Sequence, residues 1–492
     1  MVMQPTSSSM SRWIARCCLL AGLVLACTAA WPQSDDTETS TPAPSAASGG
    51  SEFSLSPQSP FSGSVPEGTA TGEVLPLSFK DAVDRGLRNN LGLLLQGDNT
   101  MYVHGERWKE LSNLLPNLNA SISETAAQQD LAALGFRGFA GIPTVIGPYN
   151  YFDMHASLTQ RVFDLHALQR ERGAAANEKA AQQSYRDARE FVVLAIGNAY
   201  LLAIAAAARV ETAQAQVETA QALYDKTADQ QKAGLVPAID ALRAQVELQS
   251  RQQQLIVARN TFAKQKLTLA RIIGLAPGQE FKLTTRAPYE PLAAMGVDEA
   301  LRRAYNARSD YQAARIKVAA AQYFRRAATA EHVPSLDVAG NYGDVGVTPG
   351  NSHGVFQVTG TLNIPIFAGG KAHADTLQAE ANLRQYRSQM DDLRGRIDYE
   401  VRTALLDLAA AAQQVEVARS SVTLADQTLT QARDRFAAGV ADNLEVVQAQ
   451  EAVAAANESY ISSLYSHNLA KVALAHAIGF AEQGVMEYLN RP

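Results

Sequence analysis

The residues best suited to chemistry in this chain are scattered and do not form a reactive group. Gly369-Gly370-Lys371 resembles the end of a phosphate-binding loop, but Pro365 stands where the first glycine belongs and Ala372 replaces the serine or threonine. The eight histidines form no helical ligand pair with a nearby acid. No Gly-x-Ser-x-Gly motif is present, and no two acids have the spacing of a catalytic pair. The sequence therefore predicts no enzyme, no cofactor and no metal site.

Two acids do stand at matching places, because the chain repeats itself. Residues 232–245 return as residues 437–450, so that Gly234 matches Gly439 and Asp240 matches Glu445. The correspondence extends to both ends of each half. A duplication of this length indicates one structural unit used twice, as in tubes, solenoids and rings. Function is therefore expected in the assembled shape and not in a pocket.

Each half reads as a helix, a strand hairpin, a very long helix and a returning helix. Proline and glycine are almost absent from the long helices, which at 1.5 Å per residue would each reach about 100 Å. The returning helix is half as long, so it is expected to stack end to end with the opening helix. The predicted boundaries are 77–290 for the first repeat (helix 79–114, hairpin 116–163, helices 167–233 and 238–273), 291–479 for the second (helix 297–333, hairpin 334–367, helices 371–438 and 444–478) and 480–492 for a tail.

The surface that joins these helices is visible as a seven-residue repeat. Small and large apolar residues alternate along it, which is typical of a close left-handed coiled-coil seam. In the second half the small positions are Ala411, Ala418, Ala425 and Ala432, and the large ones are Val415, Val422, Leu429 and Phe436; in the first half they are Ala206, Ala213 and Ala220 with Val210, Val217 and Tyr224.

The residues after Pro116 and Pro334 alternate with period two and predict four strands, with residues 126–150 as the loop of the first hairpin. Four strands cannot close a membrane barrel, which needs about eight, and an open edge in lipid is costly. Strands from several chains must therefore join: two chains suffice by count, and three give a wider lumen. Five aromatic residues suit a girdle at the membrane interface, namely Tyr149, Tyr151, Phe152, Phe356 and Phe367.

The N-terminus reads as an export signal over residues 1–30. Arg12 and Arg16 precede an apolar run of about 14 residues, too short to span a bilayer. All three cysteines lie within it, so the exported body is free of disulfides. Val24-Leu25-Ala26-Cys27 resembles a lipoprotein cleavage box with Cys27 as the lipidated residue, and ordinary cleavage after Ala30 is the alternative. Residues 31–76, rich in Ser, Pro and Thr, predict a disordered leader.

Composition supports a helical protein that does not bind nucleic acid. Hydrophobic residues make up 47% of the chain but aromatic residues only 7%, which suits closely packed helices. The net charge of -6 leaves no basic stripe for a phosphate backbone.

Together, the paired motifs at Gly234 and Gly439, the strand exit from Leu362 to Gly370 and the duplication make this chain resemble the TolC-like outer membrane factors over residues 77–479. The resemblance implies a mainly α fold with a small β part: a homotrimer in which twelve shared strands form an outer membrane barrel above a tunnel of helices. It also implies a periplasmic adaptor at the hairpin tips and an inner-membrane transporter as partners. No nucleic acid is expected.

The same resemblance suggests site residues. In the family, acids just after the second tip ring the periplasmic aperture. Glu445 occupies the first such position and Gln448 the next, where an acid is common, while Asp240 is the counterpart in the first half. The tip residues Gly234, Leu235, Gly439 and Val440 would form the turns and contact the adaptor.

The leading hypothesis is a passive, gated exit duct for small molecules. A duct for protein secretion is the runner-up, and a periplasmic coiled-coil adaptor or scaffold without a channel is the alternative from another class. Four alternating strands and a duplicated hairpin favour the duct, because an adaptor is expected to carry a single hairpin.

Overall fold

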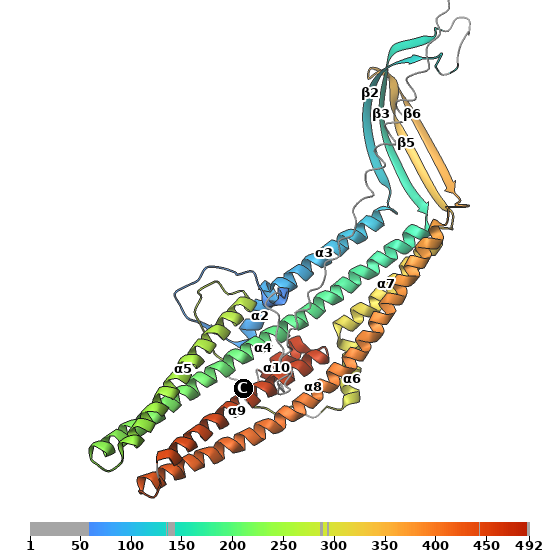
Figure 1. Ribbon diagram of the computed structural model, residues 1–492. Helices are drawn as coiled ribbons and strands as arrows, with labels where there is room; N and C mark the ends of the chain where they lie inside the picture. The colour runs from blue at the N-terminus through green and yellow to red at the C-terminus, as the bar shows by residue number, and fades with distance from the viewer. Residues whose placement is uncertain are drawn as a thin grey trace, which may run out of the picture. The chain divides into compact units, whose positions relative to one another are not determined.

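A computed structural model describes residues 59–133, 135, 143–285, 289–292, 295–441 and 443–489. Within these residues a four-stranded antiparallel sheet lies at one end, and long helices run from it to two hairpin tips (Figure 1). The predicted signal peptide, Cys27 and residues 31–58 of the leader lie outside the described part.

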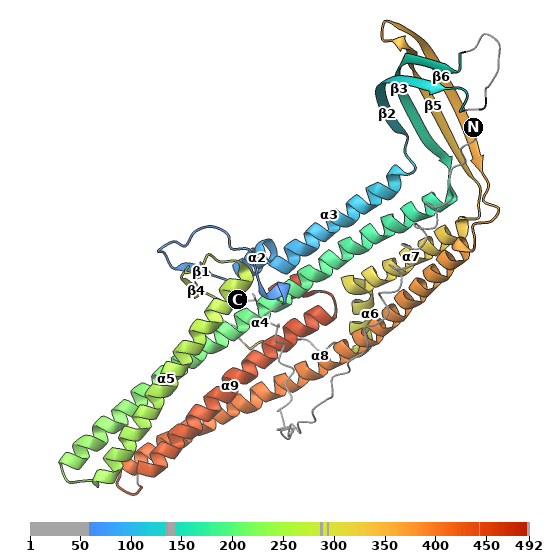
Figure 2. The ribbon, with the colours of Figure 1, turned by 45° about the horizontal axis from the view of Figure 1, so that its top comes forward.

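The duplication is visible in the helix lengths. The first half contains α2 (Phe79–Asn89), α3 (Leu91–Ser112), α4 (Leu165–Lys232) and α5 (Ala238–Ile273). The second contains α6 (Val297–Ala307), α7 (Ser309–Ala330), α8 (Lys371–Ala437) and α9 (Asn443–Ala477), followed by α10 (Ala481–Leu489). Along the layer next to the sheet the contacts run from α3 to α4, from α4 to α7 and from α7 to α8 (Figure 2).

The prediction of one opening helix per half is wrong, because each is broken once. Asn90 separates α2 from α3 with φ -65° and ψ 126°, and Arg308 separates α6 from α7 with φ -61° and ψ 120°. Neither residue is a proline or a glycine, so no local signal marks the break. The cause is tertiary, since the returning helix ends against each break.

Glycines allow these close approaches. Gly274 and Gly479 follow α5 and α9, and both have φ +72°. A Cβ on Gly274 would lie 2.5 Å from the Cβ of Asn89, and one on Gly479 would lie 2.7 Å from the backbone nitrogen of Arg308. The end-to-end placement of the returning and opening helices therefore holds, although the meeting point lies at a break within the opening segment.

The predicted coiled-coil seam of the second half forms the core between α8 and α9. All four small positions of the second half are buried, and Val415 is fully buried. Leu429, Ala432 and Phe436 pack with Val446 and Ala449 of α9. Among the described helices, α4 is also apolar and long enough to cross a membrane by length and composition, but 72% of the relevant segment is buried within the chain, so it is explained as a core helix.

The sheet has the order β2-β3-β5-β6, formed by β2 (Asn117–Asp130), β3 (Val145–Phe163), β5 (Ser335–Thr348) and β6 (Asn351–Asn363). The strands of the first hairpin reach further than predicted, because cross-strand pairing continues to Asp130 and Val145 inside the expected loop. The last strand ends earlier than predicted, at Asn363 and not at Phe367. Pro365 has no N–H to offer to a strand partner, which accounts for this end.

Part of the expected disordered leader is ordered. Residues 60–62 form the short helix η1 (Pro60–Ser62), and β1 (Leu75–Leu77) pairs in parallel with β4 (Phe281–Leu283). The Phe61 ring lies 4.9 Å from that of Phe191, and a Cβ on Gly92 would come within 2.4 Å of Phe61. One aromatic ring seated on a glycine thus attaches a polar segment to the helices.

Candidate conduit and hairpin tips

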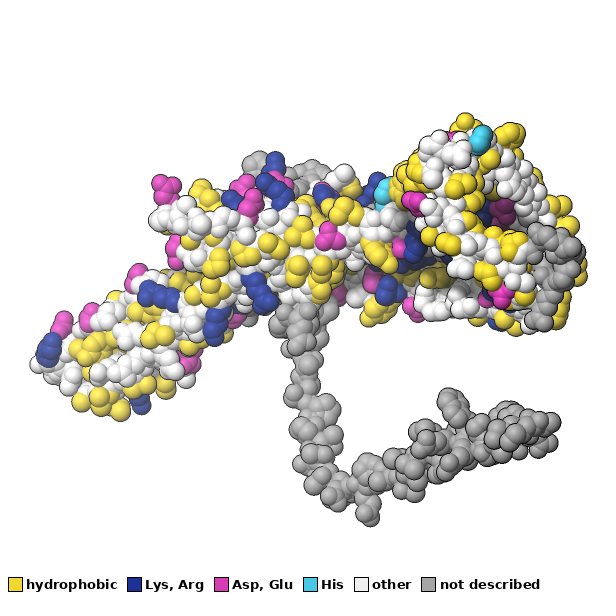
Figure 3. Space-filling view, turned by 90° about the horizontal axis from the view of Figure 1, so that it is seen from above, with side chains coloured by type: hydrophobic (Ala, Val, Ile, Leu, Met, Phe, Trp, Pro, Cys, Tyr) yellow, Lys and Arg dark blue, Asp and Glu magenta, His cyan; other side chains and the backbone are white. Residues whose placement is uncertain are grey.

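The two faces of the sheet differ in polarity. Side chains alternate between faces along a strand, so cross-strand register assigns each residue to a face. One face carries mostly exposed apolar side chains, and hydrophobic side chains are seen at the surface of the sheet end of the molecule (Figure 3). Asp344 is among the polar exceptions on this face. The apolar members of this face are Leu118, Ile122, Met154, Leu158, Tyr342, Phe356, Val358 and Leu362.

The opposite face is lined mostly by amides and hydroxyls. Its members include Asn117, Asn119, Ser121, Ser123, Ser157, Thr159, Asn341, Gln357, Thr359 and Thr361. An apolar outer face and a polar inner face are the pattern of a membrane barrel around water. The aromatic residues divide accordingly: Phe152 and Phe356 lie on the apolar face, Tyr149 and Tyr151 register with the polar face, and Phe367 lies beyond β6.

One cluster on the polar face superficially resembles a catalytic triad. His155 Nδ1 lies 2.8 Å from Asp153 Oδ1, and Ser121 Oγ lies 3.2 Å from His155 Nε2. The same Oγ is also 3.5 Å from Nδ1, so it does not lie along the Nε2 lone pair as a nucleophile must.

The sheet has two open edges within the described chain. β2 pairs with β3 alone and β6 with β5 alone. Unpaired backbone groups on such edges cost several kcal/mol each in lipid. The four strands are therefore a segment of a barrel and not a complete one.

Both hairpin tips use the same turn. Gly234 has φ +73°, its N–H donates to the Gln231 carbonyl, and the Leu235 N–H donates to the Gln230 carbonyl. In the second tip Gly439 has φ +72°, with matching bonds to Phe436 and from Val440 to Arg435. This is the Schellman motif, in which a left-handed residue ends a helix. Leu235 and Val440 are left 74% and 68% exposed at the tips.

The three predicted aperture residues have different surroundings. The side chain of Glu445 is 43% exposed, and its Oε1 lies 3.2 Å from Arg435 Nε of the same helical hairpin. Gln448 is exposed. Asp240 is only 9% exposed; it lies 3.6 Å from Arg243, and its carbonyl accepts a bond from Asn443 of α9. Equivalent acids in the two repeats therefore face different neighbours.

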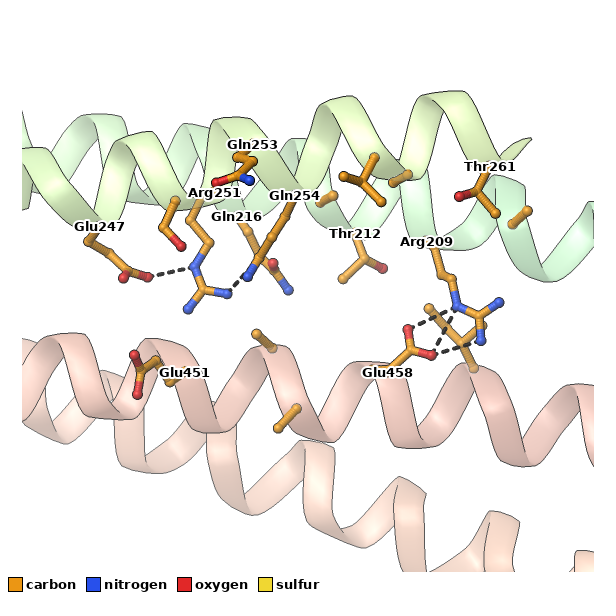
Figure 4. A pocket seen from close by; sticks show the side chains of 18 residues that line it. Arg209, Thr212, Gln216, Glu247, Arg251, Gln253, Gln254, Thr261, Glu451 and Glu458 are labelled. Carbon is orange, nitrogen blue, oxygen red and sulfur yellow. Dashed lines mark hydrogen bonds and ion pairs between the residues drawn. The ribbon is translucent and has the colours of Figure 1, made fainter. Parts of the chain in front are cut away.

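An open groove of about 820 Å³ lies between the helical hairpin α4–α5 and helix α9 (Figure 4). Its charges are largely paired with one another. Arg209 holds Glu458 with a shortest N–O distance of 2.7 Å, and the buried Arg251 binds Glu247 and Gln254. Paired charges in an open groove suit contact between helices better than chemistry.

A buried charge cluster that the sequence did not reveal lies at the second helix break. Arg308, 5% exposed, binds Asp310, Glu400 and the carbonyl of Ala477. Burial alone would raise the pKa of Asp310, but the hydrogen bond and charge of Arg308 lower it below its usual value. Burial, followed by the nearby Asp310, raises the pKa of Asp187 to about 6. Four elements, α4, α7, α8 and α9, thus meet at one arginine.

A second buried polar pair lies on α9. His467 is 1% exposed, and neither ring nitrogen has a hydrogen-bond partner among the described residues. Burial, then the charge of Lys471, lowers the pKa of His467 to about 4. Lys471 is 2% exposed, and burial lowers its pKa as well. No group of metal-ligating residues occurs in the described part of the chain.

Open sheet edges, a two-faced sheet and long helices that end in tips are the features of an outer membrane duct. Comparison with known proteins agrees: residues 110–275 and 300–480 match the family described as "Outer membrane efflux protein". The match covers more than half of the chain, which therefore belongs to this family. It is an outer membrane efflux channel whose helical part lies in the periplasm.

Individual relatives are distant but extensive. The chain is 24% identical to the alkaline protease secretion protein AprF of Pseudomonas aeruginosa over 85% of this chain and 89% of AprF. It is 22% identical to the outer membrane protein TolC of Escherichia coli over 77% of each. The CmeC outer membrane channel of Campylobacter jejuni has the same fold, with a TM-score of 0.71 at 18% identity over 84% of this chain and 89% of CmeC.

Proposed function

We propose that three copies of this chain form one duct, with twelve shared strands in the outer membrane and the hairpin tips at its periplasmic mouth. The observation that carries this is the sheet: one face is apolar, the other is polar, and both edges are open. Twelve strands leave a lumen wide enough for solutes, whereas eight would be filled by side chains.

The tips are the proposed meeting point with a periplasmic adaptor that connects the duct to an inner-membrane transporter. Leu235 and Val440 support this, because large apolar side chains held out at a turn favour a protein partner. The duct itself is passive, and the transporter supplies the energy. Small molecules are the proposed cargo.

Glu445 is the proposed selectivity residue of the periplasmic mouth. Three carboxylates around a narrow opening concentrate cations there. Arg435, 3.2 Å away, partly offsets each carboxylate, so the preference for cations is expected to be moderate. Asp240 is largely buried and is expected to contribute less, while Gln448 adds no charge.

Planar-bilayer recording of the purified protein tests the duct and its mouth together. The wild type is expected to give a small cation-selective conductance, and Glu445→Ala to give a larger, less selective one. Asp240→Asn is the matched control, with a smaller change. A wild type without any conductance would overturn the duct, whereas an unchanged Glu445→Ala would remove only Glu445 from the mouth.

Protein secretion is a second candidate because AprF is named as an alkaline protease secretion protein and aligns with 85% of this chain. A strain that lacks this protein separates the two. Increased accumulation of fluorescent dyes with an unchanged set of extracellular proteins would support small-molecule efflux. Loss of one extracellular protein with unchanged dye accumulation would support secretion.

A further inference from the structure

The helices α3 and α8 each have an uncovered face. Within the described chain they lie on opposite edges of the helical layer, with α4 and α7 between them (Figure 1). α3 packs on α4, with η1 and α2 at its start, and α8 packs on α6, α7 and α9. The far flanks of α3 and α8 therefore have no neighbour in the described part of the chain, although both carry regular patterns.

The uncovered face of α3 carries large side chains every seven residues. These are Leu94, Met101 and Trp108, and Leu115 continues the spacing just beyond the end of α3 at Ser112; they are between 41% and 69% exposed. Leu95 and Tyr102 flank them and are exposed as well. A seven-residue apolar repeat is the pattern of a helix that packs along a second helix. We call this row the α3 ridge.

The uncovered face of α8 carries small residues at the same spacing. Ala374, Ala381, Ser388 and Gly395 are all exposed and lie about 120–180° around the helix from the buried Leu383, which packs on α7. Gly395 sits inside a 67-residue helix, and a Cβ there would meet nothing within 4 Å. Glycine is less favourable than alanine in a helix, and no neighbour among the described residues requires a glycine here. We call this row the α8 groove.

The sheet edges indicate what covers both rows. β2 follows α3 directly, β6 precedes α8 directly, and β2 and β6 are the two unpaired edges of the sheet. When β6 of one copy pairs with β2 of the next, α8 of the first copy and α3 of the second come side by side. The two helices then run antiparallel, because each joins the sheet at the same end.

We propose that the α3 ridge of one copy packs into the α8 groove of the next copy in a fixed register. Leu94 lies against Gly395, Met101 against Ser388, Trp108 against Ala381 and Leu115 against Ala374. The helical part of the ridge, from Leu94 to Trp108, and the part of the groove opposite it, from Ala381 to Gly395, each span 14 residues, or about 21 Å. This inference rests on the proposed assembly of several copies and assigns the faces and the register by which they meet.

Exposed residues on α5 and on the tip-side half of α8 independently support packing between neighbouring copies. Exposed Ile256 and Leu267 of α5 are eleven residues apart, as are exposed Leu406 and Val417 of α8, and all four are between 67% and 71% exposed. Antiparallel packing pairs Ile256 with Val417 and Leu267 with Leu406.

The two registers also agree where they meet. The first residue of α3 then lies opposite residue 398 of α8, and the last residue of α5 lies opposite residue 400. These positions are adjacent, as they must be, because α5 ends against the break before α3. One neighbouring α8 can therefore follow α3 and α5 without interruption.

Cysteine cross-linking tests the register, since no natural cysteine follows Cys27. Leu94→Cys combined with Gly395→Cys in one chain is expected to give a covalent trimer in outer membranes treated with a short bismaleimide. Leu94→Cys with Ala381→Cys is the matched control: it is displaced by two heptads, about 21 Å, and should stay monomeric on a denaturing gel. Equal cross-linking of both pairs, or of neither in an intact native trimer, would overturn the register.

Bulk in the groove provides a second test. Gly395→Leu is expected to shift the protein from trimer to monomer in native mass measurements. Gln389→Leu, exposed on the flank of the same helix, should leave the trimer intact. A Gly395→Leu trimer as stable as the wild type would overturn the inference, as would occupancy of the groove by lipid or adaptor. A monomeric wild type would instead overturn the proposed assembly itself.

Discussion

The two repeats of this chain have similar backbone conformations, but they use different polar side chains where the returning helix meets the broken opening helix. Their opening helices have the same lengths, 11 residues for α2 and α6 and 22 for α3 and α7. The tip glycines Gly234 and Gly439, and the glycines that follow the returning helices, Gly274 and Gly479, have φ values between +72° and +73°. The duplicated unit thus requires its breaks and turns at fixed places.

The helix breaks show how the side chains differ. In the first half the Asn90 side chain caps α3 by accepting from the Leu93 N–H and donates to the Phe61 carbonyl. In the second half Arg308 caps no helix with its side chain and is held by Asp310 and Glu400. The first break is stabilised by the hydrogen bonds of a neutral amide, and the second by ion pairs of a buried arginine.

A second difference lies where the returning helices α5 and α9 contact the segment between α5 and α6, which connects the two repeats. Lys266 in the first half lies over the rings of Phe262 and Phe281 and pairs with Glu280 at 3.2 Å. Its counterpart Lys471 is buried, and His467 stands in the place of Phe262. A repeated backbone conformation therefore determines where a polar side chain lies, but it does not determine which hydrogen-bond or ionic partners that side chain has.

Removing the charge at the second break should have the largest effect. Arg308→Met leaves the largely buried Asp310 without its cation beside Asp187, and we expect a loss of about 3 kcal/mol in the free energy of unfolding. Asn90→Ala removes a helix cap and should cost about 1 kcal/mol. Urea unfolding of both variants in detergent measures the difference. Equal losses would mean that the two breaks are energetically alike despite their chemistry.

The tips should instead respond equally. Gly234→Ala and Gly439→Ala force a Cβ into a left-handed conformation and should each destabilise the protein by about 1–2 kcal/mol. Asparagine tolerates this conformation better, so Gly234→Asn and Gly439→Asn are the matched controls with smaller losses. Thermal unfolding by circular dichroism measures all four. A loss at only one tip would break the equivalence of the two turns.

The buried His467 should make the stability of the protein depend on pH. The pKa of His467, lowered to about 4, lies below its ordinary value, so the unfolded chain binds more protons as the pH falls from 6.5 towards 4. The wild type should therefore lose about 2 kcal/mol of stability between pH 7 and pH 5 through this group. His467→Phe, which restores the residue of the first repeat, should lose less.

Melting temperatures at pH 7 and pH 5 test this. Phe262→His provides the control, because Phe262 is only half-buried and a histidine there should add little pH dependence. The same slope for His467→Phe and the wild type would assign the pH response to other groups, such as His476, whose pKa burial also lowers to about 4.

The sequence was most informative where the physics is local or periodic. The seven-residue repeat predicted the seam that buries Ala411 and Val415, and the two glycine motifs predicted both tips. Alternation predicted four strands, because side chains on a strand point to opposite faces. The duplication linked these elements into one architecture, and the family match confirmed the channel.

Other features depend on contacts between segments far apart in the chain. The breaks at Asn90 and Arg308 exist because α5 and α9 end against them, which no local pattern records. Phe61 orders part of a segment whose composition predicts disorder. The acids Asp240 and Glu445 are equivalent in sequence, yet one is buried against α9 and the other lies beside Arg435.

By itself, then, the sequence determined the elements, their duplication and the polarity of each strand face, because these follow from spacing along one chain. Only the tertiary structure decided where helices break, which charges are buried and which helix faces remain uncovered. Those properties are set by the packing of distant segments, since burial and pairing depend on what lies across an interface and not on what lies next in the chain.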